Sequence, residues 1–532
     1  MTTMSDFGTA GRIEDIFPVK LATGGIGAVH DVGGRPMRIP TSLIAVAIFC
    51  MALCQPASAA TYTVTTTSDS GAGSLRQAII DANANSGLDE IHFNIAGSGV
   101  RNIALSSTLP GVTSPVLIDG YTQPGSSVST STLNSNAVIL IDIHPLTAGG
   151  TSGLSFLNGS VGSTVRGLAF NRFASSQLNF TMNAGNCVVI GNFIGLAADG
   201  DTMYPSTSGT RTGITVGGAG CRVGGSAAAE RNVISGNSNG GIYVSADNVE
   251  ISGNIIGADK SGGAARPNST GIALGNMAAR PQNTLIGAGN TTRNVISGNS
   301  RWGIEIRSAD HARIHVNTIG RTAFPIFPLA NELGGILVSD GTDILIAPTV
   351  AVAGGAGNSI GSNGGPGVLV NGAGTTASIY GNLIWDNAGL PIDLAIFGEN
   401  GLDPIDNLDA DDGPNGLQNR PVITDRDNGG TTTVVHGSLH STPSSQFYLD
   451  FYGATTCSPD GHANATEYLG YVTTITDASG NASWTYNHSS LLTDGYVTAT
   501  ASTSGSVPLT SEFALCLPLA ETAVFADGFE SP

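Results

Sequence analysis

The sequence predicts an all-β protein, a right-handed parallel β-helix followed by a small β-sandwich domain. The first observation is a phrase, Asn-x-Ile-(Gly/Ser), whose spacing alternates between 22–24 and 40–41 residues. A phrase that returns at such a period is typical of coils stacked along one axis. The second observation is composition: 74 glycines in 532 residues, 40 % hydrophobic residues and only 11 % charged residues indicate a turn-rich β protein, not a disordered chain. The asparagines of the phrase are Asn192, Asn232, Asn254, Asn294, Asn317 and Asn358, with a variant at Asn382.

Residues 1–59 are interpreted as an N-terminal extension and a secretory signal peptide. Arg35 and Arg38 precede an apolar run from Ser42 to Cys54, which is short for a membrane span. Ala57-Ser58-Ala59 then forms a small-x-small site that predicts cleavage after Ala59. The true start is either Met1 or Met37, and the alternative reading of the apolar run is a membrane-anchoring helix. We predict no stable membrane span in the mature chain.

Residues 60–110 are expected to cap the first coil. A short alternating stretch begins at Tyr62, and a helical pattern follows with apolar residues at Leu75, Ala78, Ile79 and Ala82. Ser74 is a suitable N-cap for this helix. A helix placed here would cover apolar core and strand edges that the first coil would otherwise expose.

The β-helix is predicted over residues 111–395, with about 22 residues and three short strands in each coil. One coil consists of Gly241-Ile-Tyr-Val, then Val249-Glu-Ile-Ser, then Asn254-Ile-Ile-Gly. A β-propeller would need longer blades of four antiparallel strands and fits less well. Stacked asparagine amides can donate to one coil and accept from the other, so we interpret them as scaffold. Direct contact with a ligand is the alternative.

The longer steps of the repeat contain three insertions, at residues 196–212, 258–270 and 321–334. If the register is correct, all three leave the same corner of the coil, about 10 Å apart, since adjacent strands are about 4.8 Å apart. They would then form a wall beside a groove suited to an extended polymer. The alternative is that they are plain solvated insertions. The predicted lining is Tyr204, Arg211, Arg266, Arg321, Phe324, Phe327 and Glu332.

Four cysteines remain after the predicted cleavage, which is compatible with disulfides in an exported chain. Cys187 and Cys221 occupy matching places in neighbouring coils, within the separation that a disulfide accepts. Two reduced, stacked thiols are the alternative. Cys457 and Cys516 are predicted to pair in the C-terminal domain.

An acidic segment, residues 396–419, separates the coils from the C-terminal domain. Closely spaced carboxylates in a loop with glycine suit Ca²⁺, although the spacing does not match an EF-hand. A solvated acidic linker is the alternative. Residues 420–517 alternate as a β-sandwich does, and residues 518–532 form a tail. The predicted metal ligands are Asp403, Asp406, Asp409, Asp411 and Asp412.

The formal net charge of −19 makes nucleic-acid binding improbable on physical grounds, because no basic face can replace phosphate counterions. The sequence also lacks a nucleophile elbow, a phosphate-binding loop of the Walker type and a His-rich zinc motif. These observations argue against nucleic-acid binding and against the enzyme classes that those motifs define.

One segment, residues 301–315, concentrates reactive side chains in a chain that is otherwise poor in charge. A lyase acting on uronic-acid polymers needs a base and a cation, which His311 or His315 with Arg307 or Arg313 could supply. A hydrolase needs two carboxylates, and Glu305 with Asp310 is the nearby pair. Trp302 could stack on a sugar. The alternative is a salt-bridged surface patch without chemistry.

The chain resembles secreted bacterial right-handed parallel β-helix repeat proteins, which share the pectate-lyase-like architecture. The resemblance covers most of the mature chain and implies the fold. It implies no particular activity, because the wider class contains polysaccharide-degrading enzymes, adhesins and phage tailspikes, and no catalytic signature transfers to residues here. Its carriers are Ser74-Leu-Arg-Gln-Ala-Ile, Ile118-Asp-Gly-Tyr-Thr-Gln-Pro-Gly125, the Ile-Ser-Gly-Asn and Gly-Asn-x-Ile-Gly repeats, Asp411-Asp-Gly-Pro-Asn-Gly-Leu-Gln-Asn-Arg-Pro-Val, Thr510-Ser-Glu-Phe and the tail Phe525-Ala-Asp-Gly-Phe-Glu530.

Two functions are therefore carried forward. The first is a secreted or cell-surface β-helix protein that binds an extracellular polysaccharide or cell-surface glycan, with cleavage as a lyase or glycoside hydrolase left open. The alternative is a non-catalytic adhesin or structural surface protein. The enzyme hypothesis predicts that Arg307, His311, Arg313 and His315 converge under the loop wall, whereas the adhesin hypothesis predicts that they point apart or are neutralised. The sequence makes no prediction of oligomeric state.

Overall fold

The computed structural model describes residues 58–147, 152–205, 210–287, 293–322, 325–349, 357–396, 401–427, 431–458, 461–462, 464–492 and 495–518. These residues belong to one compact unit, Ser58–Pro532. The predicted signal sequence up to Ala57 and the predicted tail after Pro518 lie outside the described residues. In the described part of the chain, no helix is both long and apolar enough to cross a membrane.

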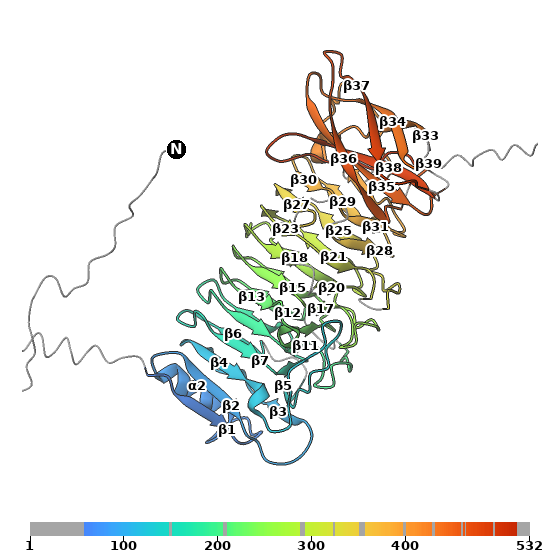
Figure 1. Cartoon of the computed structure of the whole chain (residues 1–532). Helices are drawn as coiled ribbons and strands as arrows, with labels where there is room; N and C mark the ends of the chain where they lie inside the picture. Colours follow the sequence, from blue (N-terminus) through green and yellow to red (C-terminus); the bar gives the residue numbers. More distant parts are fainter. Residues whose placement is uncertain are drawn as a thin grey trace, which may run out of the picture. The chain divides into compact units, whose positions relative to one another are not determined.

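Three parallel sheets build most of the chain (Figure 1). Sheet A has 11 strands. Its strands are β1 (Thr61–Val64), β2 (Asp89–Phe93), β4 (Val116–Asp119), β7 (Thr164–Arg166), β10 (Val188–Ile190), β13 (Arg222–Gly224), β16 (Glu250–Ser252), β19 (Leu285–Ile286), β23 (Arg313–Ile314), β27 (Ile344–Ile346) and β30 (Ala377–Ile379).

Sheets B and C have ten and nine strands. Sheet B consists of β3 (Arg101–Leu105), β5 (Ile141–Pro145), β8 (Ala169–Phe170), β11 (Phe193–Ile194), β14 (Val233–Ile234), β17 (Ile255–Ile256), β20 (Val295–Ile296), β24 (Thr318–Ile319), β28 (Ser359–Gly361) and β31 (Leu383–Trp385). Sheet C consists of β6 (Leu154–Phe156), β9 (Ser176–Phe180), β12 (Thr212–Val216), β15 (Gly240–Val244), β18 (Thr270–Leu274), β21 (Trp302–Ile306), β25 (Gly334–Val338), β29 (Val368–Asn371) and β32 (Ile392–Ala395).

The chain passes from sheet A to sheet B to sheet C and then returns to sheet A one coil further on. Every pairing within these sheets is parallel, so Ile251 on β16 lies between Val223 and Ile286 of the neighbouring coils. Ile251, Ile256 and Ile272 point from the three sheets into one shared core and are 0 % exposed. The predicted right-handed parallel β-helix is therefore confirmed, and its stacking begins already with β1.

The recurring asparagines form a ladder at the corner between sheets A and B. Asn232 Nδ2 donates to Asn254 Oδ1 (2.9 Å), and Asn254 Nδ2 donates to Asn294 Oδ1 (3.1 Å). The same bond continues from Asn294 to Asn317, Asn358 and Asn382. Each amide so joins one coil to the next, which confirms the scaffold interpretation.

A second ladder, which the sequence analysis did not separate from the first, runs along the corner between sheets B and C. Its amides bond in the same direction at 2.8–3.0 Å. Some of these asparagines end the Ile-Ser-Gly-Asn phrase, and others follow the long insertions, so their spacing is irregular in sequence although regular in space. The ladder consists of Asn237, Asn268, Asn299, Asn331, Asn363 and Asn387.

Replacing Asn294 with Ala is expected to lower the free energy of unfolding by at least about 2 kcal/mol, because buried polar partners would lose their hydrogen bonds. Asn294 is 0 % exposed; it donates to Ile251 O and Asn317 Oδ1 and accepts from Asn254. Urea unfolding measures the change. Asn102→Ala, an exposed asparagine on β3, is the matched control and should stay within about 0.5 kcal/mol. Equal effects in the two variants would contradict the ladder's role.

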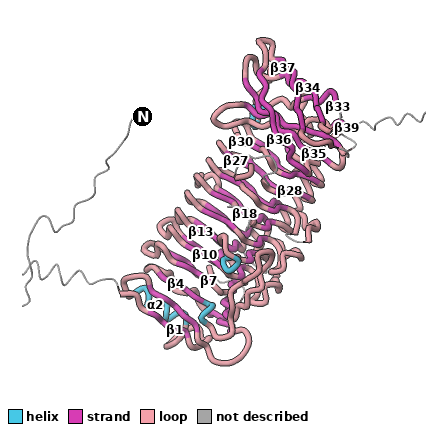
Figure 2. Tube along the Cα trace, viewed as in Figure 1, coloured by secondary structure: helices cyan, strands magenta, loops and turns pink. Residues whose placement is uncertain are grey.

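A helix covers the core at the start of the stack, as the sequence predicts. Helix α2 (Leu75–Ala84) buries its apolar face, and the Ser74 hydroxyl accepts a hydrogen bond from the Gln77 amide as N-cap. Figure 2 shows how little other helix the described part of the chain contains. The short 3₁₀ segments are η2 (Gly120–Thr122), η3 (Ala228–Glu230) and η4 (Pro414–Leu417).

The C-terminal region consists of two antiparallel sheets that enclose a second core, with Phe447, Phe451 and Trp484 among its buried residues. One sheet has the strands β33 (Val422–Asp427), β34 (Thr433–His440) and β37 (Asn481–His488). The other has β36 (Glu467–Ile475), β35 (Gln446–Ala454), β38 (Tyr496–Thr503) and β39 (Leu517–Pro518). A further pair, β22 (Ala309–Asp310) and β26 (Gly341–Thr342), lies in the turns between sheets C and A.

The C-terminal region also closes the end of the β-helix. Tyr452 and Phe513 belong to the coil core, and the Tyr452 hydroxyl accepts a hydrogen bond from the Gly381 amide (2.9 Å). Asn415 bonds to both backbone groups of Ala377 on the last strand of sheet A. The Asp411–Val422 and Thr510–Phe513 motifs that carry the family resemblance thus supply residues that pair with the last coil.

Both predicted disulfides are present. Cys187 and Cys221 join neighbouring coils with a Cα–Cα distance of 4.4 Å. Cys457 and Cys516 join two segments of the C-terminal region with a Cα–Cα distance of 6.3 Å. Two disulfides are consistent with an oxidising environment outside the cytosol.

Candidate functional site

The candidate catalytic segment, residues 301–315, is divided between two faces of the β-helix. Trp302 and Glu305 lie on β21 in sheet C, whereas Arg313 lies on β23 in sheet A. Asp310 lies on β22, in the turn between the two sheets. The segment turns a corner of the coil, so residues that are close in sequence face different directions.

Glu305 and Trp302 are largely covered. The Glu305 carboxylate accepts hydrogen bonds from Arg307 Nη2 (2.8 Å) and Thr270 Oγ1 (3.2 Å), and its side chain is 10 % exposed. Trp302 is 7 % exposed, and its ring lies against Gly334 of the next coil, where a side chain would collide with it. Trp302 therefore packs coils together and offers little surface to a sugar.

The remaining members of the segment are held by nearby carboxylates or backbone. Arg280 bonds to Asp310 and Asp340, and this guanidinium lowers the pKa of Asp310 to about 2. His311 Nδ1 (2.8 Å) and Arg313 Nη2 (2.6 Å) both contact Asp343. His315 bonds through Nδ1 to Ala347 O, and burial lowers its pKa. The four predicted cations do not converge, and three of them contact a carboxylate.

The three insertions leave the corner between sheets B and C in alternate coils, as predicted. Each contains one antiparallel bridge at the same place, Leu196–Met203, Ala258–Ala265 and Arg321–Pro328. They do not stand as a free wall. Leu196, Ala258 and Leu329 pack over the outer face of sheet B and bury its outward residues, which are Phe193, Val233, Ile255 and Val295.

The predicted loop residues serve different purposes. Arg211 is 3 % exposed and bonds to backbone carbonyls of its own loop, and the Arg172 guanidinium lies 4.5 Å from the Tyr204 ring centroid. Arg266 ties two insertions together through Asp201 (2.6 Å). Phe327 and Glu332 are exposed, and Phe324 lies outside the described residues. Arg321 lies 3.5 Å from Asp386, and Asp386 lines a cavity.

That cavity, about 660 Å³, lies between the last coil and the loop that connects β35 to β36. We call it the carboxylate cavity. It combines two carboxylates, Asp386 and Asp393, with hydroxyl and amide groups. Such a concave site with a few convergent polar groups is the usual form of a small-molecule or substrate site. Its polar lining also includes Asn387, Thr456, Ser458, His462 and Asn464.

Asp386 occupies a backbone position that glycine fills in earlier coils. It follows sheet B with φ 55°, where Gly236 and Gly298 have φ 77°. The corresponding phrase changes from Ile-Ser-Gly-Asn to Ile-Trp-Asp-Asn, which is the sequence signal that could have identified it. Arg321 Nη1 lies 3.5 Å from Asp386 Oδ2, and the Asp386 side chain is 55 % exposed. Ser362, at the same place in the preceding coil, has φ 59°, so the left-handed conformation itself belongs to the repeat and the carboxylate is what is new.

Asp393 is the buried carboxylate of the pair. It lies on β32 beside Leu369 of the preceding coil and is 4 % exposed. Among the described residues, its Oδ1 atom has no hydrogen-bond partner. Burial raises the pKa of Asp393 to about 6, although a backbone hydrogen bond from Gly401 opposes the shift. The two carboxylates of one cavity thus have different environments, which is the arrangement that separates acid and base roles.

A third carboxyl group, Glu512, lies deeper in the same region. Its carboxyl oxygens accept hydrogen bonds from the amides of Leu394 (3.2 Å) and Asp403 (2.9 Å). Burial, followed by the neighbouring Asp403 charge, raises the pKa of Glu512 to about 8. Glu512 is therefore protonated at neutral pH and joins β32 to the acidic segment.

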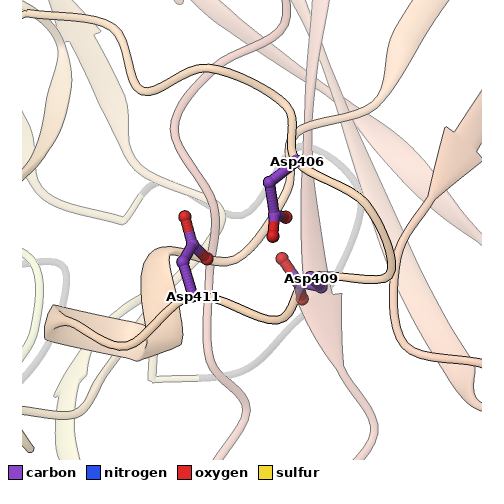
Figure 3. A group of neighbouring side chains, drawn as sticks. All are labelled: Asp406, Asp409 and Asp411. Atoms are coloured by element: carbon purple, nitrogen blue, oxygen red, sulfur yellow. The ribbon is translucent and has the colours of Figure 1, made fainter.

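Three of the five predicted metal ligands lie together. Carboxylate oxygens of Asp406, Asp409 and Asp411 fall within 4.8 Å of one another and surround one shared space (Figure 3). Burial and neighbouring carboxylates raise the pKa of Asp409 to about 6 and also raise that of Asp411. This group could bind a metal ion. Asp403 instead bonds to Glu512 through its amide, and Asp412 is exposed.

Comparisons with known proteins add only a distant likeness. No protein-family model matches the chain, and no curated protein matches it. The A-module of the mannuronan C-5 epimerase AlgE4 from Azotobacter vinelandii is 12 % identical, covers 62 % of this chain and 90 % of its own, and has a TM-score of 0.33. The Dettilon tailspike protein gp208 is 14 % identical over 84 % of this chain and 92 % of its own, with a TM-score of 0.26.

A third structure is the tailspike protein gp49 from Acinetobacter baumannii bacteriophage Fri1, a capsular polysaccharide depolymerase. It is 10 % identical over 86 % of this chain and 81 % of its own, with a TM-score of 0.24. These values are too low to support an inference about activity. The strand pairing itself defines the chain as a right-handed parallel β-helix protein with two C-terminal antiparallel sheets.

Proposed function

We propose that the chain is an exported glycoside hydrolase that cleaves an extracellular polysaccharide in the carboxylate cavity. The observation that carries the proposal is Asp393, a carboxyl group with a pKa of about 6 and an unpartnered oxygen, in one cavity with the solvated Asp386. Hydrolysis of a glycosidic bond uses one protonated and one ionised carboxyl group. The hydroxyl and amide lining suits a polyhydroxylated ligand.

In this mechanism Asp393 donates its proton to the glycosidic oxygen as the bond to the sugar carbon breaks. Asp386, beside the Arg321 guanidinium, is the second carboxylate of the pair. Water supplies the hydroxyl group of the new reducing end, and its proton restores the acid. The Glu305–Asp310 pair is less suitable, because both carboxylates already receive hydrogen bonds from arginine.

The test is incubation of the purified mature chain with a panel of polysaccharides. A hydrolase produces new reducing ends without ultraviolet absorbance, whereas a lyase produces unsaturated products that absorb. Reducing ends that disappear in Asp393→Asn support the proposal. Unsaturated products, or reducing ends that persist in that variant, exclude it.

The second candidate is a non-catalytic adhesin with the same exported β-helix. The observation that favours it is the pairing of Arg307, His311 and Arg313 with carboxylates. Glycan binding without products in either assay would select this candidate.

We also propose that Ca²⁺ occupies the group formed by Asp406, Asp409 and Asp411. A hard divalent cation prefers carboxylate oxygens and would relieve the mutual repulsion of three partly buried carboxylates. Asp411 Oδ1 is buried and has no partner among the described residues, so at least one ligand atom is available. The ion would link the acidic segment to Ser441, which bonds to Asp409 (2.9 Å).

Calcium at ten times its Kd is expected to raise the free energy of unfolding by about 1.4 kcal/mol, because it binds only the folded chain. Thermal unfolding with CaCl₂ and with EDTA measures the effect. Asp409→Asn should abolish the calcium-dependent difference, whereas Asp412→Asn, an exposed neighbour, should keep it. A calcium response that survives Asp409→Asn would place the ion elsewhere.

A further inference from the structure

A second cavity lies at the junction between the last coil and the C-terminal sheets and shares no lining residue with the carboxylate cavity. It measures about 310 Å³ and has tyrosines as its main walls, so we call it the tyrosine pocket. Tyr380 comes from the turn after β30, and Tyr448, Tyr468 and Tyr471 come from β35 and β36. The sequence pattern does not reveal this pocket, because three separate parts of the chain build it, and the third runs from Ser502 to Pro508.

One carboxylate, Asp450, lies among these rings. It is 5 % exposed, and the Tyr468 hydroxyl donates a hydrogen bond to its Oδ1 atom (2.7 Å). None of the described residues that line the pocket is an arginine, lysine or histidine. Burial raises the pKa of Asp450 to about 6, which leaves the group mainly ionised above neutral pH. The pocket therefore contains a buried negative charge without a cation in its lining.

Two of the tyrosine rings lie edge to face at the mouth of the pocket. Tyr448 and Tyr471 have ring centroids 6.1 Å apart and planes inclined at 62°, so they form two adjacent sides at a wide angle. Tyr471 is 54 % exposed and Tyr448 is 36 % exposed, which leaves this side of the pocket open to solvent. Ring faces attract cations, and cages of aromatic residues recognise quaternary ammonium groups.

We propose that the tyrosine pocket binds an organic ammonium group, with the tyrosine rings as walls and Asp450 as the counter-charge. A neutral sugar would leave the buried carboxylate without a cation, and a buried charge is costly unless it is paired. The net charge of −19 also attracts cations to the protein. The pocket is separate from the carboxylate cavity, and the proposal stands independently of hydrolysis.

The ammonium group could belong to an amino sugar or to a choline-type headgroup, and the probes distinguish these sources. Calorimetric titration of the mature chain with glucosamine, choline and glucose gives three affinities. We expect at least one ammonium probe to bind tenfold or more tightly than glucose. Tighter binding of glucosamine indicates an amino sugar, and tighter binding of choline indicates the headgroup. Glucose binding as tightly as glucosamine and choline, or absence of binding by both ammonium probes, would overturn the proposal.

Variants separate charge from shape. Asp450→Asn keeps an acceptor for Tyr468 but removes the charge, and it should weaken ammonium binding tenfold or more. Tyr471→Ala removes an exposed wall and should weaken binding several-fold, while Tyr471→Phe keeps the ring face and should restore most of it. Asp425→Asn, an exposed residue on β33 in the other sheet, is the charge-matched control and should change nothing. Unaltered affinity in both Asp450→Asn and Tyr471→Ala would contradict the site.

Discussion

Replacing Asp393 with Asn should lower kcat/KM for polysaccharide hydrolysis by about 10²–10⁴-fold, the usual contribution of a general acid. Asparagine has nearly the same shape but cannot donate the proton that the leaving sugar oxygen needs. Asp393 lies on β32 and is buried beside Leu369 of β29. Because asparagine has nearly the same size, the substitution should keep the packing of the last coil. Rates of reducing-end formation at about pH 5.5, where the acid is mostly protonated, measure the loss.

The pH dependence should have a definite sign. The acid must be protonated, so the wild-type rate should fall as pH rises through about 6, the pKa to which burial raises the Asp393 carboxyl group. Substrates with leaving groups that need no protonation should lose much less rate in Asp393→Asn and should show a weaker decline above that pH. These two readouts distinguish loss of an acid from a general loss of structure.

Glu305→Gln is the informative control, because Glu305 belongs to the site that the sequence favoured. The rate in this variant should stay within about twofold of the wild type. A larger loss in Glu305→Gln than in Asp393→Asn would return the active site to the outer face of sheet C and would refute the carboxylate cavity.

The fold could be predicted from the sequence because every coil needs the same kinds of residue at the same places. Each coil needs an amide at the corner between sheets A and B and apolar residues such as Ile251 and Ile256 beside it, so the pattern recurs with little variation. The second ladder was harder to recognise. Asn237 and Asn268 differ in local phrase, since one follows a short connection and the other follows an insertion.

The carboxylate cavity could not be predicted from the repeat, because it forms where the last coil meets the C-terminal region. The notable charges of residues 301–315 are largely engaged in ion pairs that alternation alone cannot reveal, since Asp343 lies 30 residues from Arg313 in sequence. Asp386 replaces a glycine of the earlier Ile-Ser-Gly-Asn phrases, next to a change from Ser to Trp385, and Asp393 lies in an ordinary strand. Their common cavity exists because the loop containing Asn464 packs against the last coil.

Replacing Glu512 with Gln should reduce the dependence of stability on pH between about 6.5 and 8. The folded chain holds the Glu512 proton up to a pKa of about 8, whereas an unfolded chain releases it near the ordinary value of 4.5. The folded state therefore binds more protons than the unfolded state in this range. The contribution of Glu512 to the free energy of unfolding is fully present below about pH 4.5 and is lost as the pH rises through about 8. The slope reaches about 1.4 kcal/mol per pH unit in the wild type, or several kcal/mol in all.

The difference between the wild-type and Glu512→Gln slopes isolates Glu512, because Asp393, Asp409 and Asp450, with pKa values of about 6, contribute to both slopes. Two backbone amides, of Leu394 and Asp403, donate to the Glu512 carboxyl group. The Gln side chain has only one acceptor oxygen, so its NH2 group would face one of these donors and that hydrogen bond would be lost. The free energy of unfolding should therefore also fall by about 1 kcal/mol. The decisive quantity is therefore the slope of unfolding free energy against pH, not its value. Glu467→Gln, an exposed residue on β36, should keep the wild-type slope, and an equally steep Glu512→Gln profile would show that Glu512 is ionised in the folded chain.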